Sequence, residues 1–412
     1  MPIIEVVSHI NPVCSTLSTK PSHIHAWRLG IVCILPVLQC RGNFVTGSLE
    51  SGANYYLIKA SKARSVANAT FAVEDLIGCV PPHDARILYM ARVDPHLVFA
   101  AEVVLDVDRS LLDEFAQIQQ KYLRRMLGLS ERSMIIPLFT KTGVWPIKYC
   151  CLMIAITYLQ YLLALPASHY ACAAFEESVA MDLRKVPCWL SDLRIVLMRL
   201  PTNPVMLPGD VSSMTVDDCQ AIMGQIKDSC VAYCRAWVEE SLRTLLLRER
   251  MVREENAVVI SMRKYLVDVP VPKYRIAMAR LMASEHPLAV ERLRHNERYC
   301  PRVPRKWRLC RFCVRGNGVL GTEVEDELHA LWTCTSNERL VSTREQFLHD
   351  AFTALPSLRN VYSSSDPLVW TRTMWEKVQM MTFFPKYVFD VFEIFRNEEI
   401  WTPAPYLYAP VM

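Results

Sequence analysis

The clearest pattern along the chain is the recurrence of apolar residues every three or four positions, which is typical of amphipathic α-helices. It is strongest between Ser110 and Leu127, where polar and basic side chains fall between the apolar ones. The apolar stripe of this segment consists of Leu111, Phe115, Ile118, Tyr122 and Met126. The segment is therefore predicted to be a helix with one core face and one basic face.

The same spacing predicts further helices, bounded by prolines or polar capping residues. Helices are expected over residues 171–183, 190–200 and 215–250. A hydrophobic pair near the C-terminus is expected to break at Pro385. Two more helices are predicted from their stripes: one after Lys59 with Val66, Ala69, Val73 and Leu76, and one with Leu340, Phe347, Ala351 and Phe352.

Residues 150–166, CCLMIAITYLQYLLALP, contain no charged side chain. A membrane-spanning helix needs about 20 apolar residues, and this run is shorter, contains Thr157 and Gln160, and ends at Pro166. It is predicted to be a buried core helix with Pro146 in its first turn, with membrane attachment as the alternative.

Composition supports a helical, globular chain of two or three domains. Hydrophobic residues make up 51% of the 412 residues and charged residues 21%, which excludes global disorder. Glycine contributes only 12 residues, well below the usual fraction of about 7%, and this disfavours a turn-rich all-β fold.

The 15 cysteines are scattered and odd in number, and the first residues, MPIIEVVSHINPVC, lack the pattern of a secretory signal. We therefore expect a reducing compartment, the nucleus or the cytoplasm, and no secretion.

Four residues have the spacing of a metal site: Cys310-x2-Cys313-x15-His329-x4-Cys334. A Cys-x-x-Cys turn supplies two thiolates, and a histidine and a cysteine from a nearby element complete a closed, structural zinc site. Thr322 and Glu325 are interpreted as the capping box of the helix that carries His329. Residues five apart on an α-helix point about 140° away from each other, so this helix has to end near Trp332 or Thr333.

Other interpretations of this stretch stay open. The four residues could be unrelated buried side chains, a catalytic zinc site, or a Cys310–Cys313 disulfide, and GNGVLG, residues 316–321, matches a dinucleotide fingerprint without the strand that should precede it. His295 and Cys300 are second-choice ligands. Cys230 and Cys234 are predicted to be core residues.

The segment from Arg292 to Arg315 is strongly basic, with nine Lys or Arg residues against one acid, Glu297, a net charge of +8. Arginines and lysines can neutralise phosphates while aromatic rings stack on bases; a solvated arginine-rich linker is the alternative. The candidate nucleic-acid-binding residues are Arg302, Arg305, Lys306, Trp307, Arg308, Arg311, Phe312 and Arg315.

No catalytic motif is found in the sequence, and we expect no enzymatic activity. TVDDC, residues 215–219, superficially resembles the paired aspartates of a polymerase, but Asp217 and Asp218 fit the first turn of a helix capped by Thr215. A P-loop, a nucleophile elbow and an H-E-x-x-H pattern are all missing from the sequence.

Three segments together resemble the region after the polymerase domain in fungal non-LTR, LINE-type retrotransposon reverse transcriptases. They are LYMARVDPHLVFAAEVVLDVD (88–108), KYLRRMLGLSERSMIIPLFTKTGVWPIKY (121–149) and CRFC…VEDELHALWTC (310–334). YVFDVFEIF and PAPYLY are similar to the family's C-terminal tail, so the resemblance covers roughly residues 55–412. It implies a helical thumb-like and linker region followed by a zinc knuckle that positions template RNA or target DNA. The polymerase palm and any endonuclease are not matched.

These observations predict a mainly α fold: a multi-helix, thumb/linker-like bundle, a small CCHC zinc knuckle and C-terminal helices. The expected division is 1–55, poorly specified; 56–200, thumb/linker-like; 201–290, connector; 291–340, basic segment and knuckle; and 341–412, C-terminal helices and tail. The expected function is a non-catalytic, zinc-stabilised, retrotransposon-derived fragment that binds RNA or DNA and has no small-molecule substrate. The alternatives are an all-helical scaffold protein with a structural zinc and a retroelement remnant without function.

Overall fold

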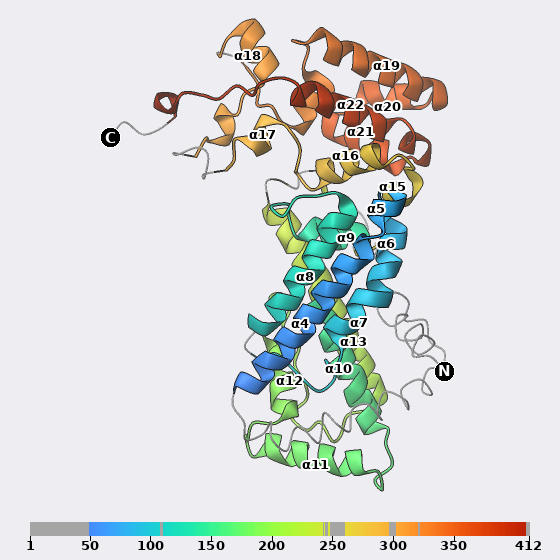
Figure 1. Ribbon diagram of the computed structural model, residues 1–412, viewed down its shortest axis with the longest axis vertical. Helices are drawn as coiled ribbons and strands as arrows, with labels where there is room; N and C mark the ends of the chain where they lie inside the picture. The colour runs from blue at the N-terminus through green and yellow to red at the C-terminus, as the bar shows by residue number, and fades with distance from the viewer. Residues whose placement is uncertain are drawn as a thin grey trace. The chain divides into compact units, whose positions relative to one another are not determined.

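A computed structural model describes residues 49–107, 110–241, 243, 246–247, 260–295, 302–319 and 322–408 of the chain. These residues form helices and no β-sheet, as predicted from the apolar spacing (Figure 1). Extended pairing in the described part is limited to two isolated antiparallel bridges, Thr142 with Met262 and Leu309 with Val324. Residues 1–48 of the predicted N-terminal segment 1–55 lie outside the described residues.

The described residues fall into two compact units. The first contains those within 1–126, 138–240 and 258–262, and the second those within 127–137, 241–257 and 263–412. The finer division into five segments stays a prediction.

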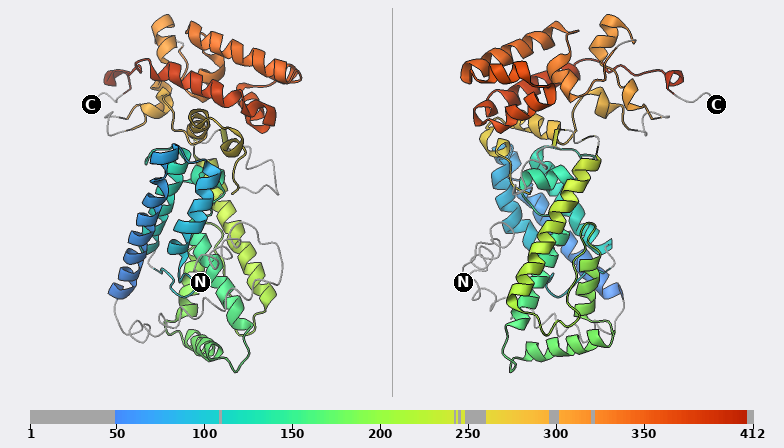
Figure 2. Two further views of the ribbon diagram at one scale, coloured as in Figure 1. Left: turned by 45° about the vertical axis from the view of Figure 1, so that its right-hand side comes forward. Right: turned by 180° about the vertical axis from the view of Figure 1, so that it is seen from behind.

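The first unit is built from helices of very different length. They are α4 (Leu49–Phe71), α5 (Glu74–Ile77), α6 (Pro82–Leu88), the π-helix η2 (Tyr89–Val93), α7 (Asp94–Val98), α8 (Ser110–Leu127), α9 (Ile136–Thr142), α10 (Ile147–Leu163), α11 (Tyr170–Leu183), α12 (Trp189–Met198) and α13 (Val216–Glu240). Figure 2 shows α10 and α13 side by side, and these two helices pack closely along their length.

Helix α8 has the predicted bounds and nearly the predicted core face. Phe115, Ile118, Tyr122 and Met126 are buried, and Leu111 is half-buried. Gln119, one of the polar residues expected to lie outside the apolar stripe, is fully buried because its amide makes several internal hydrogen bonds. It donates to the Tyr89 hydroxyl and the Trp145 carbonyl, both at 2.9 Å, and accepts from the Ile147 amide at 2.9 Å.

The face predicted for the helix after Lys59 was wrong. In α4 the buried residues are Tyr56, Ala60, Ala63, Ala67 and Phe71, whereas Ala69 is exposed and Leu76 lies beyond the end of the helix with 86% of its surface exposed. The alanines form the contact face because their small side chains let neighbouring helices approach closely.

Helix α10 supplies much of the first unit's core, including Ile147, Tyr149, Leu152, Ile156 and Leu159. Pro146 occupies its N-cap, one residue before the first-turn position predicted for it. Among the described residues, no single helix meets the length and hydropathy expected of a membrane span. The pair α9 and α10 meets them together, although the two helices are bent by 61°.

Helix α13 begins as predicted and ends earlier than predicted, at Glu240. The Thr215 hydroxyl accepts from the Asp218 amide at 3.2 Å, and the Asp218 carboxylate accepts from the Thr215 amide at 2.8 Å. This reciprocal capping confirms that Asp217 and Asp218 belong to the first turn of a helix.

The second unit contains shorter helices around an aromatic core. They are α15 (Tyr265–Asp268), α16 (Pro272–Met282), α17 (Ala289–Arg292), η4 (Arg305–Trp307), α18 (Arg311–Asn317), the π-helix η5 (His329–Thr333), α19 (Glu338–Ala354), α20 (Leu358–Ser364), α21 (Pro367–Glu376), η6 (Val378–Met381), α22 (Phe384–Arg396) and η7 (Pro405–Leu407). Pro385 lies in the first turn of α22, which confirms the predicted break. Rings of Trp332, Phe347, Trp370, Phe384 and Tyr387 pack together.

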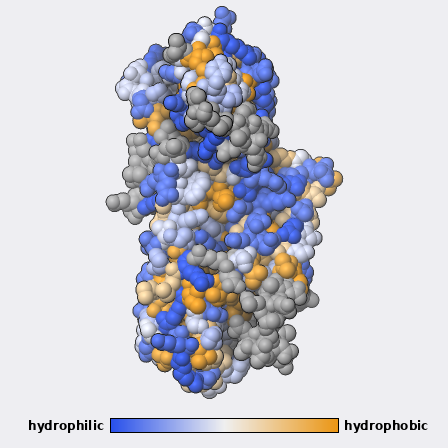
Figure 3. All heavy atoms as spheres, turned by 90° about the vertical axis from the view of Figure 1, so that its left-hand side faces the viewer, coloured by the Kyte–Doolittle hydropathy of each residue, from blue (hydrophilic) through white to orange (hydrophobic). Residues whose placement is uncertain are grey.

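Exposed large apolar residues occur in both units. On the face drawn in Figure 3 they are interspersed with hydrophilic ones. Leu76, Ile77, Met206 and Tyr406 are among the most exposed large apolar side chains of the described residues.

A buried carboxyl group in the first unit predicts a pH-dependent stability. Burial raises the pKa of Asp94 from 3.8 to about 6, partly offset by a hydrogen bond with Tyr89. The folded state therefore binds this proton more tightly than the unfolded state. The stabilisation is complete below pH 3.8 and is lost as the pH rises through 6.

Asp94→Asn should remove this pH dependence while keeping an acceptor for Tyr89. Between about pH 4.5 and pH 7.5, the free energy of unfolding of Asp94→Asn should gain about 2 kcal/mol relative to the wild type. Urea unfolding at both pH values measures this, with the exposed Asp228→Asn as control. Parallel pH profiles for Asp94→Asn and the wild type would refute the assignment.

Candidate metal centre

Cys310, Cys313, His329 and Cys334 converge in the second unit. All four are buried, and their ligand atoms lie within 4.8 Å of one another. The Sγ atoms of Cys310 and Cys313 are each 3.8 Å from that of Cys334, and His329 Nε2 is 3.4 Å from Cys313 Sγ. Tetrahedral coordination with metal–sulfur bonds of about 2.3 Å places two sulfurs about 3.8 Å apart. The four side chains can therefore hold one metal ion.

The two cysteines of the first arm are positioned by a short extended pairing and a helix start. Leu309 bridges Val324, and the Cys310 amide donates to the Glu323 carbonyl at 2.9 Å. Cys310 is the N-cap residue of α18, and Cys313 lies in its first turn. The chain thereby turns back on itself and holds both thiols on one side.

The second arm contains a π-helical turn. His329 begins η5, the helix ends at Thr333, and the Cys334 amide donates to the His329 carbonyl at 2.9 Å. An i→i+5 turn winds more slowly than an α-helix, so residues five apart return to the same side. The expected helix end is confirmed, and the π turn, which the sequence did not suggest, explains how Cys334 reaches His329.

Neighbouring polar groups orient two of the ligands. His329 Nδ1 lies 2.7 Å from Glu323 Oε2 and 3.1 Å from the Thr333 hydroxyl. A carboxylate on Nδ1 favours the tautomer that leaves the Nε2 lone pair for a metal. The Ser336 hydroxyl donates to Cys313 Sγ at 3.4 Å.

The electrostatics of the cluster couple the ionisation of its thiols to the binding of a cation. A hydrogen bond with Cys334, together with burial, raises the pKa of the Cys310 thiol, and burial raises that of Cys313. Burial alone would lower the pKa of His329, but hydrogen bonding with Cys310 and Glu323 raises it. Thiols packed this closely ionise readily only next to a positive charge, which a divalent metal supplies.

The predicted capping box of Thr322 and Glu325 was wrong. The Thr322 hydroxyl donates to the Gly318 carbonyl, and the Asp326 carboxylate accepts from the His329 amide at 3.0 Å, which is the N-cap role expected of Thr322. Glu325 is extended and fully buried because its carboxylate forms an ion pair with Arg311.

The Arg311–Glu325 pair is bidentate, with hydrogen bonds of 2.6 and 2.9 Å between side chains that are 3% and 0% exposed. The Arg311 guanidinium also donates to the carbonyls of Pro287, Phe395 and Glu398. Glu325 accepts from the Ala289 amide at 2.7 Å. The pair therefore joins the metal-ligand segment to two other segments of the second unit, residues 287–289 and 395–398.

The candidate nucleic-acid-binding residues divide into two groups. Arg308, Arg311 and Phe312 are buried: Arg308 donates to the Val303 and Val290 carbonyls, and Phe312 packs on Phe395. These three side chains maintain the fold, and their burial leaves them no surface for a nucleic acid. The other group is accessible: Arg302, Arg305, Lys306 and Arg315 are exposed, and Trp307 is half-buried.

The second-choice ligands do not join the cluster. His295 is half-buried and is not among the four clustered residues, and Cys300 lies outside the described residues. Cys230 and Cys234 are fully buried in α13, as predicted. Cys310, Cys313 and Cys334 are free thiols, which argues against the Cys310–Cys313 disulfide.

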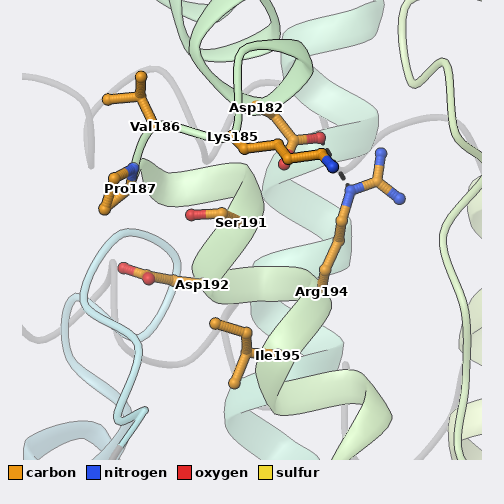
Figure 4. Close-up of a pocket in the computed structure, with 8 residues that line it drawn as sticks. All are labelled: Asp182, Lys185, Val186, Pro187, Ser191, Asp192, Arg194 and Ile195. Atoms are coloured by element: carbon orange, nitrogen blue, oxygen red, sulfur yellow. Dashed lines mark hydrogen bonds and ion pairs between the residues drawn. The ribbon is translucent and has the colours of Figure 1, made fainter.

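A pocket of 390 Å³ lies in the first unit between the end of α11 and α12 (Figure 4). At its edge Arg194 donates to the Asp182 carboxylate at 2.8 Å. The Ser191 hydroxyl is bonded to the backbone of Cys188, at 2.8 Å to both its amide and its carbonyl, so it caps α12. The lining residues are Asp182, Lys185, Val186, Pro187, Ser191, Asp192, Arg194 and Ile195.

Breaking the buried ion pair should be costly. Arg311→Met leaves an unpaired buried carboxylate and should lower the free energy of unfolding by about 3–5 kcal/mol. The double variant Arg311→Met/Glu325→Gln removes the stranded charge and should be at least about 1 kcal/mol more stable than the sum of the single changes predicts. Denaturant unfolding of all the variants measures the coupling.

The matched control is the exposed pair of Arg315 and Glu398, 2.6 Å apart with side chains 52% and 42% exposed. Arg315→Met should cost less than about 1 kcal/mol, because exposed ion pairs contribute little. Equal losses for Arg311→Met and Arg315→Met would contradict the structural role of the buried pair.

Comparison with known proteins does not assign the chain to a family: no family model, no curated protein and no solved structure matches it. The chemistry of the four ligands and of their surroundings therefore carries the functional conclusion.

Proposed function

We propose that Cys310, Cys313, His329 and Cys334 bind a structural zinc ion. Thiolate and imidazole ligands in a tetrahedral arrangement suit Zn²⁺ better than the oxygen-preferring cations. Four protein ligands fill a tetrahedral shell and leave no position for a water or substrate, as in structural rather than catalytic zinc sites. Its role is to stabilise the second unit.

We further propose that this zinc-stabilised unit binds RNA or DNA. The observation that carries this proposal is the group of exposed cations directly before the first ligand: Arg302, Arg305 and Lys306. Trp307 lies beside them, half-buried against Ala289, Leu293 and Val303. Exposed cations held in fixed positions by a zinc-stabilised unit are suited to contact phosphates.

The resemblance to LINE-type reverse transcriptases gives this proposal its context. A segment derived from the C-terminal region of such an enzyme would position RNA or target DNA without catalysing polymerisation, and the nucleus would be its place of action. The Thr215–Asp218 cap supports a non-catalytic role for the Asp217 and Asp218 pair.

A scaffold protein with a purely structural zinc is the second candidate. The observation that favours it is the internal pairing of two exposed arginines: Arg305 with Asp326 at 2.8 Å and Arg315 with Glu398 at 2.6 Å. These pairs direct part of the positive charge toward the protein itself. Nucleic-acid binding separates the two candidates.

Zinc binding is tested by metal analysis of the purified protein. We expect one zinc per wild-type chain and a clear loss of zinc from Cys313→Ser, because a missing thiolate opens the site. Cys79→Ser, at an exposed cysteine of the first unit, is the control and should keep its zinc. Wild-type protein without zinc, or full occupancy in Cys313→Ser, would exclude the site.

Nucleic-acid binding is tested by charge reversal at Arg302 and Lys306, two exposed residues whose change leaves the Arg305–Asp326 pair intact. Wild-type affinity should fall steeply between about 50 and 200 mM salt. The variant Arg302→Glu/Lys306→Glu should bind more weakly, and its slope of log affinity against log salt should be smaller by about 2. Fluorescence anisotropy with labelled RNA and DNA measures both quantities.

The control carries the same charge change at Lys121→Glu/Arg339→Glu, two exposed residues on α8 and α19. It should bind like the wild type. Salt-independent binding, or equal losses in both double variants, would leave the scaffold as the better function.

A further inference from the structure

A second group of basic residues lies in the first unit, on α4 and on the consecutive segments α6, η2 and α7. Residues 51–73 contain Lys59, Lys62 and Arg64 and no acidic residue, and residues 85–101 contain Arg86 and Arg92 with Asp94 as their one acid. Asp94 is buried against Tyr89. The two segments therefore concentrate positive charge wherever they meet at the surface.

Contacts at both ends show that the two segments run antiparallel. At one end, the Tyr56 hydroxyl donates to the Val104 carbonyl at 3.3 Å. At the other end, Phe71 and Tyr89 both pack on Tyr122, with ring centroids 4.6 and 5.2 Å apart. Helices α4 and α7 pack against each other between these points (Figure 1).

In this antiparallel arrangement Lys59 lies opposite Phe99. Lys62 follows Lys59 by about one helical turn and lies opposite His96, which precedes Phe99 by about one turn. The first pairing is direct, with Lys59 Nζ 3.7 Å from the centroid of the Phe99 ring. Lys62 is exposed, Lys59 and His96 are half-buried, and Phe99 is 43% exposed. Three potential cations and one aromatic ring thus share a single accessible strip.

The pKa shifts of Lys59 and His96 agree with the closeness of the basic side chains. Burial lowers the pKa of Lys59, and the charge of Lys62 lowers it further. Burial, Lys59 and Lys62 lower the pKa of His96 in the same way. An anion in the strip would relieve this repulsion and favour the charged forms. Arg64, on the same helix, is directed to Glu114 at 3.1 Å.

We propose that Lys59, Lys62 and His96 form a binding site for phosphate groups, with Phe99 at its edge. Ammonium and imidazolium groups recognise phosphate as compact charges, and the exposed ring offers a stacking surface to an ester that carries a base. Inorganic polyphosphate, a nucleotide and an oligonucleotide share this phosphate chemistry. The site shares no residue with the metal centre and requires no metal.

The test follows His96 by NMR in the full-length protein, with its ring signals identified by their loss in His96→Gln. Tripolyphosphate and a single-stranded oligothymidylate of about 12 nucleotides are titrated separately at constant ionic strength. Either probe should shift the His96 signals and raise its pKa, because a bound phosphate stabilises the imidazolium. A response to tripolyphosphate identifies a site for the phosphate group itself. A response to the oligonucleotide alone, weakened in Phe99→Leu, identifies a site for a phosphodiester with its base.

Lys59→Gln/Lys62→Gln should raise the dissociation constant read at His96 about tenfold. Lys121→Gln, an exposed lysine on α8, is the matched control and should leave it unchanged. The proposal is overturned if neither probe moves the His96 signals, or if the double variant binds like the wild type. Because the signal is local to His96, either outcome leaves the zinc and nucleic-acid proposals for the second unit untouched.

Discussion

The buried ion pair of Arg311 and Glu325 is the interaction on which the second unit's candidate site depends. Arg311 lies between the ligands Cys310 and Cys313, and Glu325 lies two residues after Glu323, whose carbonyl accepts from the Cys310 amide. Their charges are both withdrawn from water, which is costly unless every polar atom finds a partner. The carbonyls of Pro287, Phe395 and Glu398 and the Ala289 amide supply those partners. The arrangement satisfies the charges only when these segments meet, and the ligands converge as a consequence.

The buried polar groups of the second arm are also satisfied by hydrogen bonds from other parts of the second unit. Arg344 of α19 donates to the carbonyls of Leu331 and Cys334 at 3.0 and 2.7 Å, and the Tyr387 hydroxyl donates to that of Leu331. These bonds use carbonyls that the π turn leaves without helical partners. The aromatic core around Trp332 therefore fixes the turn that brings Cys334 back to His329. A metal ion would add to a geometry that the surrounding protein already favours.

Positive charge has two different uses in this chain. Arg308 donates to internal carbonyls and Arg311 pairs with Glu325, so their charge contributes to the fold. Arg302 and Lys306 are exposed, as is Lys62 in the first unit, and their charge can act on a ligand. A count of basic residues along the sequence does not distinguish buried from exposed arginines and lysines. The residue type alone does not show whether a carboxylate or a carbonyl lies within bonding distance in the folded chain.

The sequence by itself determined the helical class, the bounds of α8, the cap of α13 and the four candidate ligands, because apolar spacing, capping residues and ligand spacing are local properties. It misjudged the buried face of α4, the place of Gln119 and the role of Glu325. Each of these depends on a partner distant in the chain: a closely packed helix, the Trp145 carbonyl, or the Arg311 guanidinium. Only the tertiary structure decided them, since a polar side chain is stable in the core only where folding brings a matching donor or acceptor to it.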